Sequence, residues 1–285
     1  MPKHSSFPSV SRATRWRTQV LEHAALALRM RHFAEAEQLA TELLRVSRTD
    51  VAAVSILARA LIDQNRGEEA IAPLEKAARH SSNAGVEILL GAALGGAGRR
   101  EEAIEQLRRT AARRPPFIPA FQELAGQLAK SGRLDEAIAA VEGGLRLAPE
   151  AIDLQIDLAR LHLQRNERAK ARAILLKACE AAPGRPEVLI ALARVRLLDG
   201  EYALAADGYR HALAHRPDDA MTRADLAACL LEMGEREAGE SNLRSALRSG
   251  PQMLGRTTYA LAASSHGRFF FRASAVAKFL RGEPV

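Results

Sequence analysis

The sequence predicts an all-α protein built as a solenoid of about seven helix-turn-helix repeats. Two residue types recur with the same period of about 34 residues, in register with each other. Alanine recurs at Ala36, Ala70, Ala103, Ala137, Ala171 and Ala205, and proline at Pro115, Pro149, Pro183, Pro217 and Pro251. Self-similarity at a fixed period of this length indicates stacked helical units that bury their apolar faces on one another.

Each repeat is predicted to be a helix, a tight turn, a second helix and a stop. Small residues at positions 8 and 20 of the repeat let the two backbones approach closely, while Leu at position 7 fills the seam. Position 8 holds Ala24, Ala58, Gly91, Ala125, Ala159, Ala193 and Ala227. Position 15 holds residues that tolerate the left-handed end of a helix, namely Gly98, Gly132, Gly200, Gly234, Asn65 and Asn166. The recurring prolines end the second helix.

The fourth repeat displays the pattern most fully, with Phe121, Leu124, Ala125, Leu128, Gly132, Ala137, Leu145 and Pro149. Over roughly residues 17–253 the chain resembles the tetratricopeptide repeat family, whose pattern has Leu, Gly or Ala, Ala and Pro at the matching positions. The Trp that the family carries at position 4 is absent. The resemblance implies a right-handed superhelix whose first helices line the inner, concave surface.

The predicted organisation has three parts. Residues 1–15 are expected to be a mobile basic leader, and residues 16–253 the repeat solenoid. Residues 254–285 are expected to form a degenerate eighth repeat or a C-terminal capping helix pair. The predicted repeats are 17–50, 51–83, 84–117, 118–151, 152–185, 186–219 and 220–253.

Composition narrows the cellular setting. No apolar run approaches the roughly 20 residues that a membrane span requires. Cys179 and Cys229 lie fifty residues apart beside apolar neighbours, so we expect two buried free thiols in a reducing, cytoplasmic setting. Arginine outnumbers lysine and alanine is abundant, which is typical of bacterial proteins from GC-rich genomes.

No catalytic, metal or cofactor site is predicted. The sequence has no P-loop, HExxH or GxSxG motif. The glycines between Gly91 and Gly98 are interpreted as structural. His211 and His215 share a helix face without an apparent third ligand, so we interpret them as a surface pair. His162 is expected to be a core histidine with a satisfied hydrogen bond.

A net charge of +7 raises the question of nucleic acid. The densest basic cluster is Arg108, Arg109, Arg113 and Arg114, but its helix also carries Glu101, Glu102 and Glu105. Aromatic residues that would stack on bases are not interleaved with this cluster. We therefore favour a solvated helix face over nucleic-acid binding, with acidic proteins as plausible partners.

The family's concave groove is the predicted binding surface. The Lys and Asn of the chaperone-tail carboxylate clamp are missing from the matching positions. Two neighbouring repeats instead carry Ile-Arg-Leu columns, Ile156, Arg160 and Leu163 beside Ile190, Arg194 and Leu197, with a weaker echo at Arg59. Apolar strips beside guanidinium groups suit an amphipathic or acidic segment of another protein. Equally favoured is internal pairing of these arginines with Asp157, Asp153 and Glu187.

The C-terminal segment is rich in phenylalanine and basic residues. A helix after Gly267 is predicted to hold Phe269, Phe270, Phe271, Val276, Phe279 and Leu280, with Arg268, Arg272, Lys278 and Arg281 among them. We expect this helix to cover the open end of the solenoid. The alternative is docking on a partner or on an acidic membrane surface.

These observations predict a non-enzymatic scaffold or adaptor that binds a peptide or helix of a partner protein in its concave groove. An alternative function is an accessory or assembly factor of a bacterial envelope-polysaccharide or glycan-modifying system. A weaker alternative is a repeat protein that senses peptides. The sequence does not identify the partner, because one fold of this kind serves many functions.

Overall fold

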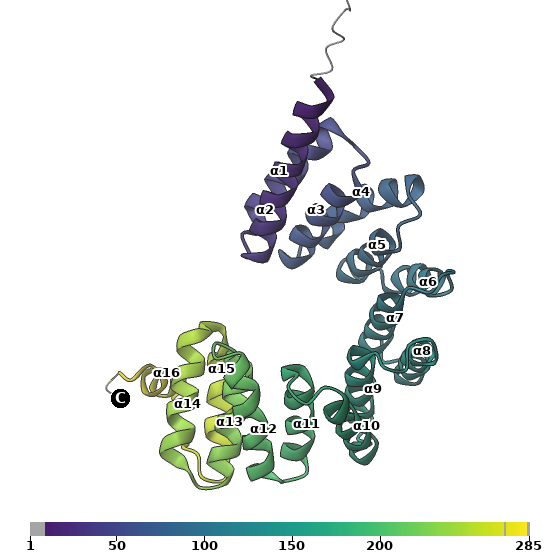
Figure 1. The fold of residues 1–285 in the computed structure, drawn as a ribbon. Coiled ribbons are helices and arrows are strands. Elements are labelled where there is room, and N and C mark those ends of the chain that lie inside the picture. The colour runs from purple at the N-terminus through teal and green to yellow at the C-terminus, as the bar shows by residue number, and fades with distance from the viewer. Residues whose placement is uncertain (1–8, 271, 284–285) are drawn as a thin grey trace, which may run out of the picture. The chain divides into compact units, whose positions relative to one another are not determined.

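The computed structural model describes residues 9–270 and 272–283, and every regular element in this part of the chain is a helix (Figure 1). The chain divides into two compact units, Met1–Pro149 and Glu150–Val285. The first unit contains α1 (Ser9–Arg29), α2 (Phe33–Val46), α3 (Val51–Asp63), α4 (Gly67–His80), α5 (Ala84–Gly96), α6 (Arg100–Ala111), α7 (Ile118–Lys130) and α8 (Leu134–Leu147). The second contains α9 (Ile152–Gln164), α10 (Arg168–Ala181), α11 (Pro186–Leu198), α12 (Tyr202–His215), α13 (Ala220–Glu232), α14 (Arg236–Ser249), the short 3₁₀ helix η1 (Pro251–Met253), α15 (Leu254–Ala263) and α16 (Ala273–Arg281).

Helices pack on their sequence neighbours within each unit. In the first unit, α1 also contacts α3, α3 contacts α5, and α5 contacts α7. In the second unit, α9 contacts α11, α11 contacts α13, and α13 contacts α15. Contacts between each repeat and the next are the packing pattern of a helical solenoid. The predicted all-α repeat fold is confirmed.

Small residues make the close helix contacts possible. The six alanines at position 20, from Ala36 to Ala205, are all 0% exposed. In the seventh repeat Gly239 takes this place, and an added Cβ would lie 2.7 Å from Cγ of Leu231. Gly91 at position 8 is constrained in the same way, because a Cβ there would lie 2.5 Å from Cγ of Leu107. The interpretation of Gly91 as a structural glycine is confirmed.

A second glycine of the third repeat meets a partner from the next repeat. An added Cβ at Gly95 on α5 would lie 2.3 Å from Oε1 of Gln127 on α7. Gln127 is buried, and its Nε2 donates to Oε1 of Glu123 at 2.8 Å. Because Gly95 has no side chain, the buried amide of Gln127 from the next repeat can pack directly against α5.

The turns between paired helices adopt the predicted left-handed conformation. Position 15 has φ between +76° and +82° where it is Gly and +60° where it is Asn65 or Asn166. Arg31 takes the same conformation in the first repeat, with φ +62°, although its side chain disfavours it. The recurring prolines follow the ends of α6, α8, α10, α12 and α14, where they prevent the second helix from continuing.

The N-terminal boundary differs from the prediction. Helix α1 begins at Ser9, inside the segment expected to be a mobile leader, and residues 1–8 lie outside the described residues. Within α1, Nε of Arg17 donates to Oδ2 of Asp50 at 2.6 Å. Asp50 also caps α3 by accepting from the backbone amides of Ala52 and Ala53. This contact links the middle of α1 to the start of α3.

The C-terminal segment also differs in detail. The predicted phenylalanine helix is wrong at its start, because α16 begins at Ala273 and leaves Phe269 and Phe270 in the preceding connection. Phe271 lies outside the described residues. Val276 and Leu280 lie four residues apart on one face of α16 and are both buried, whereas consecutive phenylalanines in a sequence would not share a helix face.

Helix α16 packs on α14 and α15. Val276 and Leu280 are buried in a cluster with Leu243, Leu247 and Leu261, and Phe270 and Phe279 pack against it. The guanidinium groups of Arg244 and Arg268 lie 4.6 and 5.2 Å from the ring centroid of Phe279. Phe269, by contrast, is 74% exposed.

Both cysteines are free, as predicted, but only Cys229 is buried; Cys179 is partly exposed. Burial and the nearby Asp225 carboxylate raise the pKa of the Cys229 thiol to about 12. Its thiolate is therefore scarce at neutral pH.

The first prediction concerns the small position 20. Ala171 is 0% exposed, so Ala171→Leu should overpack the seam between α9 and α10 and lower the free energy of unfolding by about 1–3 kcal/mol. The exposed Glu180 on the same helix provides the control, and Glu180→Gln should stay within about 0.5 kcal/mol. Urea melts of both variants measure the difference, and equal midpoints would contradict the predicted close approach.

The second prediction concerns the C-terminal segment. Deleting residues 268–285 should expose the apolar face of α14 and remove Arg268, an ion-pair partner of the buried Glu240 carboxylate. We expect the truncated protein to melt at a lower temperature and to aggregate. Thermal melts with light scattering measure this. A truncated chain that stays soluble with an unchanged melting temperature would instead favour the docking role.

Candidate functional site

The groove residues predicted in the second unit lie around a cavity of about 200 Å³ between α9, α10 and α11. Of the six predicted residues, five line this cavity. They are Ile156, Arg160 and Leu163 on α9, and Ile190 and Arg194 on α11. Leu197 does not line it and packs against a neighbouring cluster that includes Leu226 and Leu230. Leu175, Glu187 and Ala191 complete the lining.

The cavity has an apolar floor and a cationic rim. Ile156 is only 5% exposed and belongs to the same core cluster as Leu175, so it forms part of the floor. Ile190 is half-buried above it, whereas the Arg160 side chain is 64% exposed. The spacing of four residues that places Ile156 below Arg160 repeats at Ile190 and Arg194, which gives two parallel columns on adjacent helices.

The two groove arginines differ in their ion pairs. Arg160 donates from Nη1 to Oδ1 of Asp157 at 2.8 Å, as the pairing alternative predicted. Arg194 makes no hydrogen bond or ion pair within the described part of the chain. An exposed ion pair such as the one between Arg160 and Asp157 contributes only about 0–1 kcal/mol to stability, so Arg160 can exchange Asp157 for another carboxylate.

The other acidic residues considered as internal partners are held elsewhere. Asp153 pairs with Nη2 of Arg185 at 2.5 Å, and Glu187 pairs with Arg185 and Arg216. A hydrogen bond from its own backbone amide and these two guanidinium groups hold the pKa of Glu187 below its usual value, although partial burial opposes this. Glu187 therefore stays ionised at the cavity edge without occupying Arg194.

Arg59, the weaker echo of these columns, lies on α3 in the first unit. It is exposed and forms no ion pair among the described residues. One turn before Arg59, the Ser55 hydroxyl donates to the carbonyl of Val51 at 2.7 Å. The second repeat therefore has at this position a hydroxyl that is already hydrogen-bonded within its own helix.

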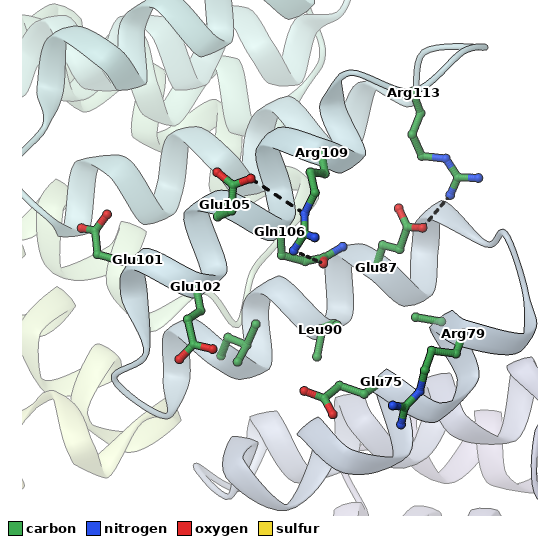
Figure 2. Close-up of a pocket in the computed structure, with 12 residues that line it drawn as sticks. Glu75, Arg79, Glu87, Leu90, Glu101, Glu102, Glu105, Gln106, Arg109 and Arg113 are labelled. Atoms are coloured by element: carbon green, nitrogen blue, oxygen red, sulfur yellow. Dashed lines mark hydrogen bonds and ion pairs between the residues drawn. The ribbon is translucent and has the colours of Figure 1, made fainter.

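A larger cleft of about 950 Å³ lies between α4, α5 and α6 in the first unit (Figure 2). We call it the α4–α6 cleft. Leu90 and Leu94, four residues apart on α5, provide apolar lining. The charged lining comprises Glu75, Glu87, Glu101, Glu102, Glu105, Arg79, Arg109 and Arg113. Five carboxylates against three guanidinium groups make the lining acidic in a chain whose formal net charge is +7.

Carboxylates lie along the whole α4–α6 cleft, with Glu75 beside Arg79 in Figure 2. Figure 2 shows Glu101, Glu102 and Glu105 toward one end, and Arg113 beside Glu87 toward the other. Arg113 pairs with Glu87 at 2.9 Å, and both side chains are partly buried. Arg109 lies 3.9 Å from Glu105 and donates to Oε1 of Gln106 at 3.2 Å.

Sequence reasoning missed this cleft. The order of charge along α6, acidic first and basic last, is visible in the sequence but is also common on solvated helices. What the sequence did not reveal is that α4 and α6 leave space above α5. The signal available was the pair Glu75 and Arg79 on α4, which repeats the acidic-to-basic order of α6 one repeat earlier.

Two family models for tetratricopeptide repeats match this chain. One matches residues 21–84 and 88–152, and the other matches residues 128–195. The chain belongs to the tetratricopeptide repeat family. Repeats of this family generally mediate protein–protein interactions, and proteins built from them are typically non-enzymatic scaffolds. No curated protein matches the sequence of this tetratricopeptide repeat protein.

Solved structures resemble its fold. The protein superposes with a TM-score of 0.62 on a tetratricopeptide repeat protein from Parabacteroides merdae, with 14% identity over 85% of this chain and 98% of the other. It also superposes with a TM-score of 0.59 on a chain of the APC/C hetero-tetramer Cut9–Hcn1, at 18% identity. That match covers 92% of this chain but 55% of the other, so the protein spans about half the length of that relative. These likenesses are limited to the fold.

The histidines of the tetratricopeptide repeat protein do not assemble a metal site within the described residues. His211 and His215 lie on α12, and no group of three or more His, Cys, Asp or Glu side chains suited to a metal ion occurs in this part of the chain. His162 is buried, and its Nδ1 lies 2.6 Å from Oε2 of Glu167. The interpretation of His162 as a satisfied core histidine is confirmed. No helix in the described residues is long and apolar enough to cross a membrane.

The third prediction follows from this histidine arrangement. Treatment with EDTA should leave the melting temperature unchanged, because two imidazoles without a third ligand hold a divalent ion weakly. Differential scanning calorimetry before and after dialysis against the chelator measures this. A fall in melting temperature that stoichiometric zinc restores would contradict the prediction.

Proposed function

We propose that this tetratricopeptide repeat protein is a non-enzymatic interaction scaffold that binds a helix or extended peptide of a partner protein over α9 and α11. The observation that carries the proposal is the cavity with an Ile156 floor and the exposed Arg160 and Arg194 at its rim. The partner segment carries an apolar side chain for the cavity and Asp or Glu for the guanidinium groups.

The size of the cavity favours one anchoring side chain. About 200 Å³ is less than the roughly 300–1,000 Å³ typical of small-molecule sites, but it suits a single apolar residue of a peptide. A side chain that fills a pocket at the centre of an interface contributes most of the binding energy, and the charged rim sets specificity and register.

The fourth prediction tests the two arginines together. Arg160→Glu with Arg194→Glu places carboxylates where the partner's carboxylates bind, so recovery of bound partners should fall at least tenfold. Affinity capture followed by quantitative mass spectrometry measures recovery against the wild-type protein. Both side chains are exposed, so circular dichroism and the melting temperature should change little.

The control is Arg45→Glu with Arg248→Glu, which changes the net charge equally at exposed positions that line neither cavity. Partners that depend on the groove should be retained by this control and lost from the groove variant. Recovery of the same partners from both variants would refute the proposed surface. Unfolding of the groove variant alone would show that the arginines serve stability.

A further inference from the structure

Helix α16 has an apolar face and a cationic face on opposite sides. Val276 and Leu280 are buried on the inner face, in the cluster formed with α14 and α15. Ser274, Lys278 and Arg281 are spaced four and three residues apart, so they share the outer face, and all three are exposed. In Figure 1, α16 lies beside α14 at the edge of the second unit. The capping contacts of the inner face therefore leave the outer face accessible.

The segment that leads into and includes α16 has no acidic residue. Residues 241–282 contain seven Arg or Lys and no Asp or Glu, which is the longest run without an acidic residue in the chain. On the other helices, bases alternate with acids that pair with them, as Arg133 does with Glu136. The charge of residues 241–282 is therefore of one sign.

Part of this positive charge is neutralised by buried carboxylates from outside the segment. Arg268 and Arg244 both pair with the buried Glu240. Arg256 pairs with the buried Asp225. These three cations hold the segment to α13 and α14, so we do not count them in a binding surface.

The cations of α16 and its N-cap are not engaged in this way. Arg272 and Lys278 are exposed and have no ion pair within the described residues. The Arg281 side chain is 57% exposed and approaches Glu283 only to 4.0 Å, and the Glu283 side chain is itself 47% exposed. These three cations are therefore available to anions in solution.

An exposed aromatic ring lies beside these cations in the chain. Phe269 precedes Arg272 by three residues, in the connection that leads into α16, and it is 74% exposed. Phe270 and Phe279, by contrast, pack against the core cluster, with their ring centroids 5.3 Å apart. The Phe269 ring therefore contributes little to the core, and it can enter an apolar phase without disrupting the cap.

These features together match the surface of an anionic lipid bilayer. The headgroup phosphates attract cations, and the boundary with the acyl chains accepts an aromatic ring. A nucleic acid would also attract the cations, but base stacking uses successive rings, and the described part of residues 268–283 exposes only Phe269. An acidic peptide would pair with the cations but would need a separate apolar pocket for Phe269. A bilayer supplies both kinds of contact at once.

We propose that the outer side of α16 binds the surface of an anionic lipid bilayer. Arg272, Lys278 and Arg281 contact the headgroups, and the Phe269 ring inserts at the boundary with the acyl chains. The inner face keeps its capping contacts, so the segment does not unfold on binding. One inserted ring with three cations gives weak, reversible attachment. The site shares no residue with the groove over α9 and α11, so it does not depend on the proposed function.

Vesicle flotation with the full-length protein tests the proposal. Vesicles of equimolar phosphatidylcholine and phosphatidylglycerol should bind the protein about tenfold or more tightly than vesicles of phosphatidylcholine alone. Raising the salt concentration should weaken this binding, because salt screens the cations from the headgroups. Equal binding to the two kinds of vesicle would overturn the proposal.

A charge variant then locates the surface. It carries Arg272→Gln, Lys278→Gln and Arg281→Gln. Its matched control makes the same charge change at exposed residues of other helices and their connections, with Arg45→Gln, Arg48→Gln and Lys177→Gln. The charge variant should lose about tenfold or more in affinity for the anionic vesicles, whereas the control should bind as the wild type does. Equal affinity of the variant and its control would refute the proposed surface.

The inserted ring is tested separately. Phe269→Ser should weaken binding about threefold or more, and the control Val46→Ser, at a side chain with a similar exposure of 73%, should not. In Phe269→Trp, the emission should shift to shorter wavelength when anionic vesicles are added, beyond any change that Trp16 shows in the wild-type protein. Absence of this shift would contradict insertion.

Circular dichroism melts check that the variants fold, and their melting temperatures should change little because the substituted side chains are exposed. If the charge variant does not fold, Lys278→Gln with Arg281→Gln replaces it, and a loss of affinity of about threefold or more is then required. Single-stranded oligothymidine and polyglutamate serve as competing anions at equal molar charge. Tighter binding to either than to the anionic vesicles would overturn the bilayer as the occupant.

Discussion

The close approach of paired helices at position 20 is the constraint on which this structure depends. The alanines from Ala36 to Ala205 have no exposed surface, and each sits where a larger side chain would separate two backbones. Because the spacing of each pair is set there, the positions of its surface side chains follow. The Ile-Arg columns of α9 and α11 lie side by side because these two first helices of successive repeats pack against each other.

The two candidate surfaces arise from different helix layers and differ in chemistry. Over α9 and α11 the rim is cationic, and Glu187 is occupied by Arg185 and Arg216. In the α4–α6 cleft the excess charge is negative. The formal net charge of +7 is a sum over the whole chain. It therefore indicates neither the cationic rim nor the acidic cleft, because it does not say on which face each charge lies.

The repeat period predicted the fold well because small residues, turn glycines and prolines act on the backbone nearest to them in the sequence. Their effects can therefore be inferred from the residue type alone. Gly98 and Asn65 adopt the left-handed turn, and α6 and α8 end before Pro115 and Pro149. Features that depend on contacts distant in sequence were not accessible. The hydrogen bond between Arg17 and Asp50 joins residues 33 positions apart, and the α4–α6 cleft depends on the separation of two helices that are not adjacent in sequence.

The contact between Gly95 and Gln127 means that the repeats are not interchangeable parts. Gly91 and Gly239 are matched to particular leucines in the same way, each within its own repeat. A third repeat moved next to a neighbour without Gln127 would leave an empty space, whereas an alanine at Gly95 would force the Gln127 amide to move. Recombination between copies of the repeat is therefore constrained at this junction. The packing at this interface between repeats therefore depends on the order in which the repeats follow one another in the chain.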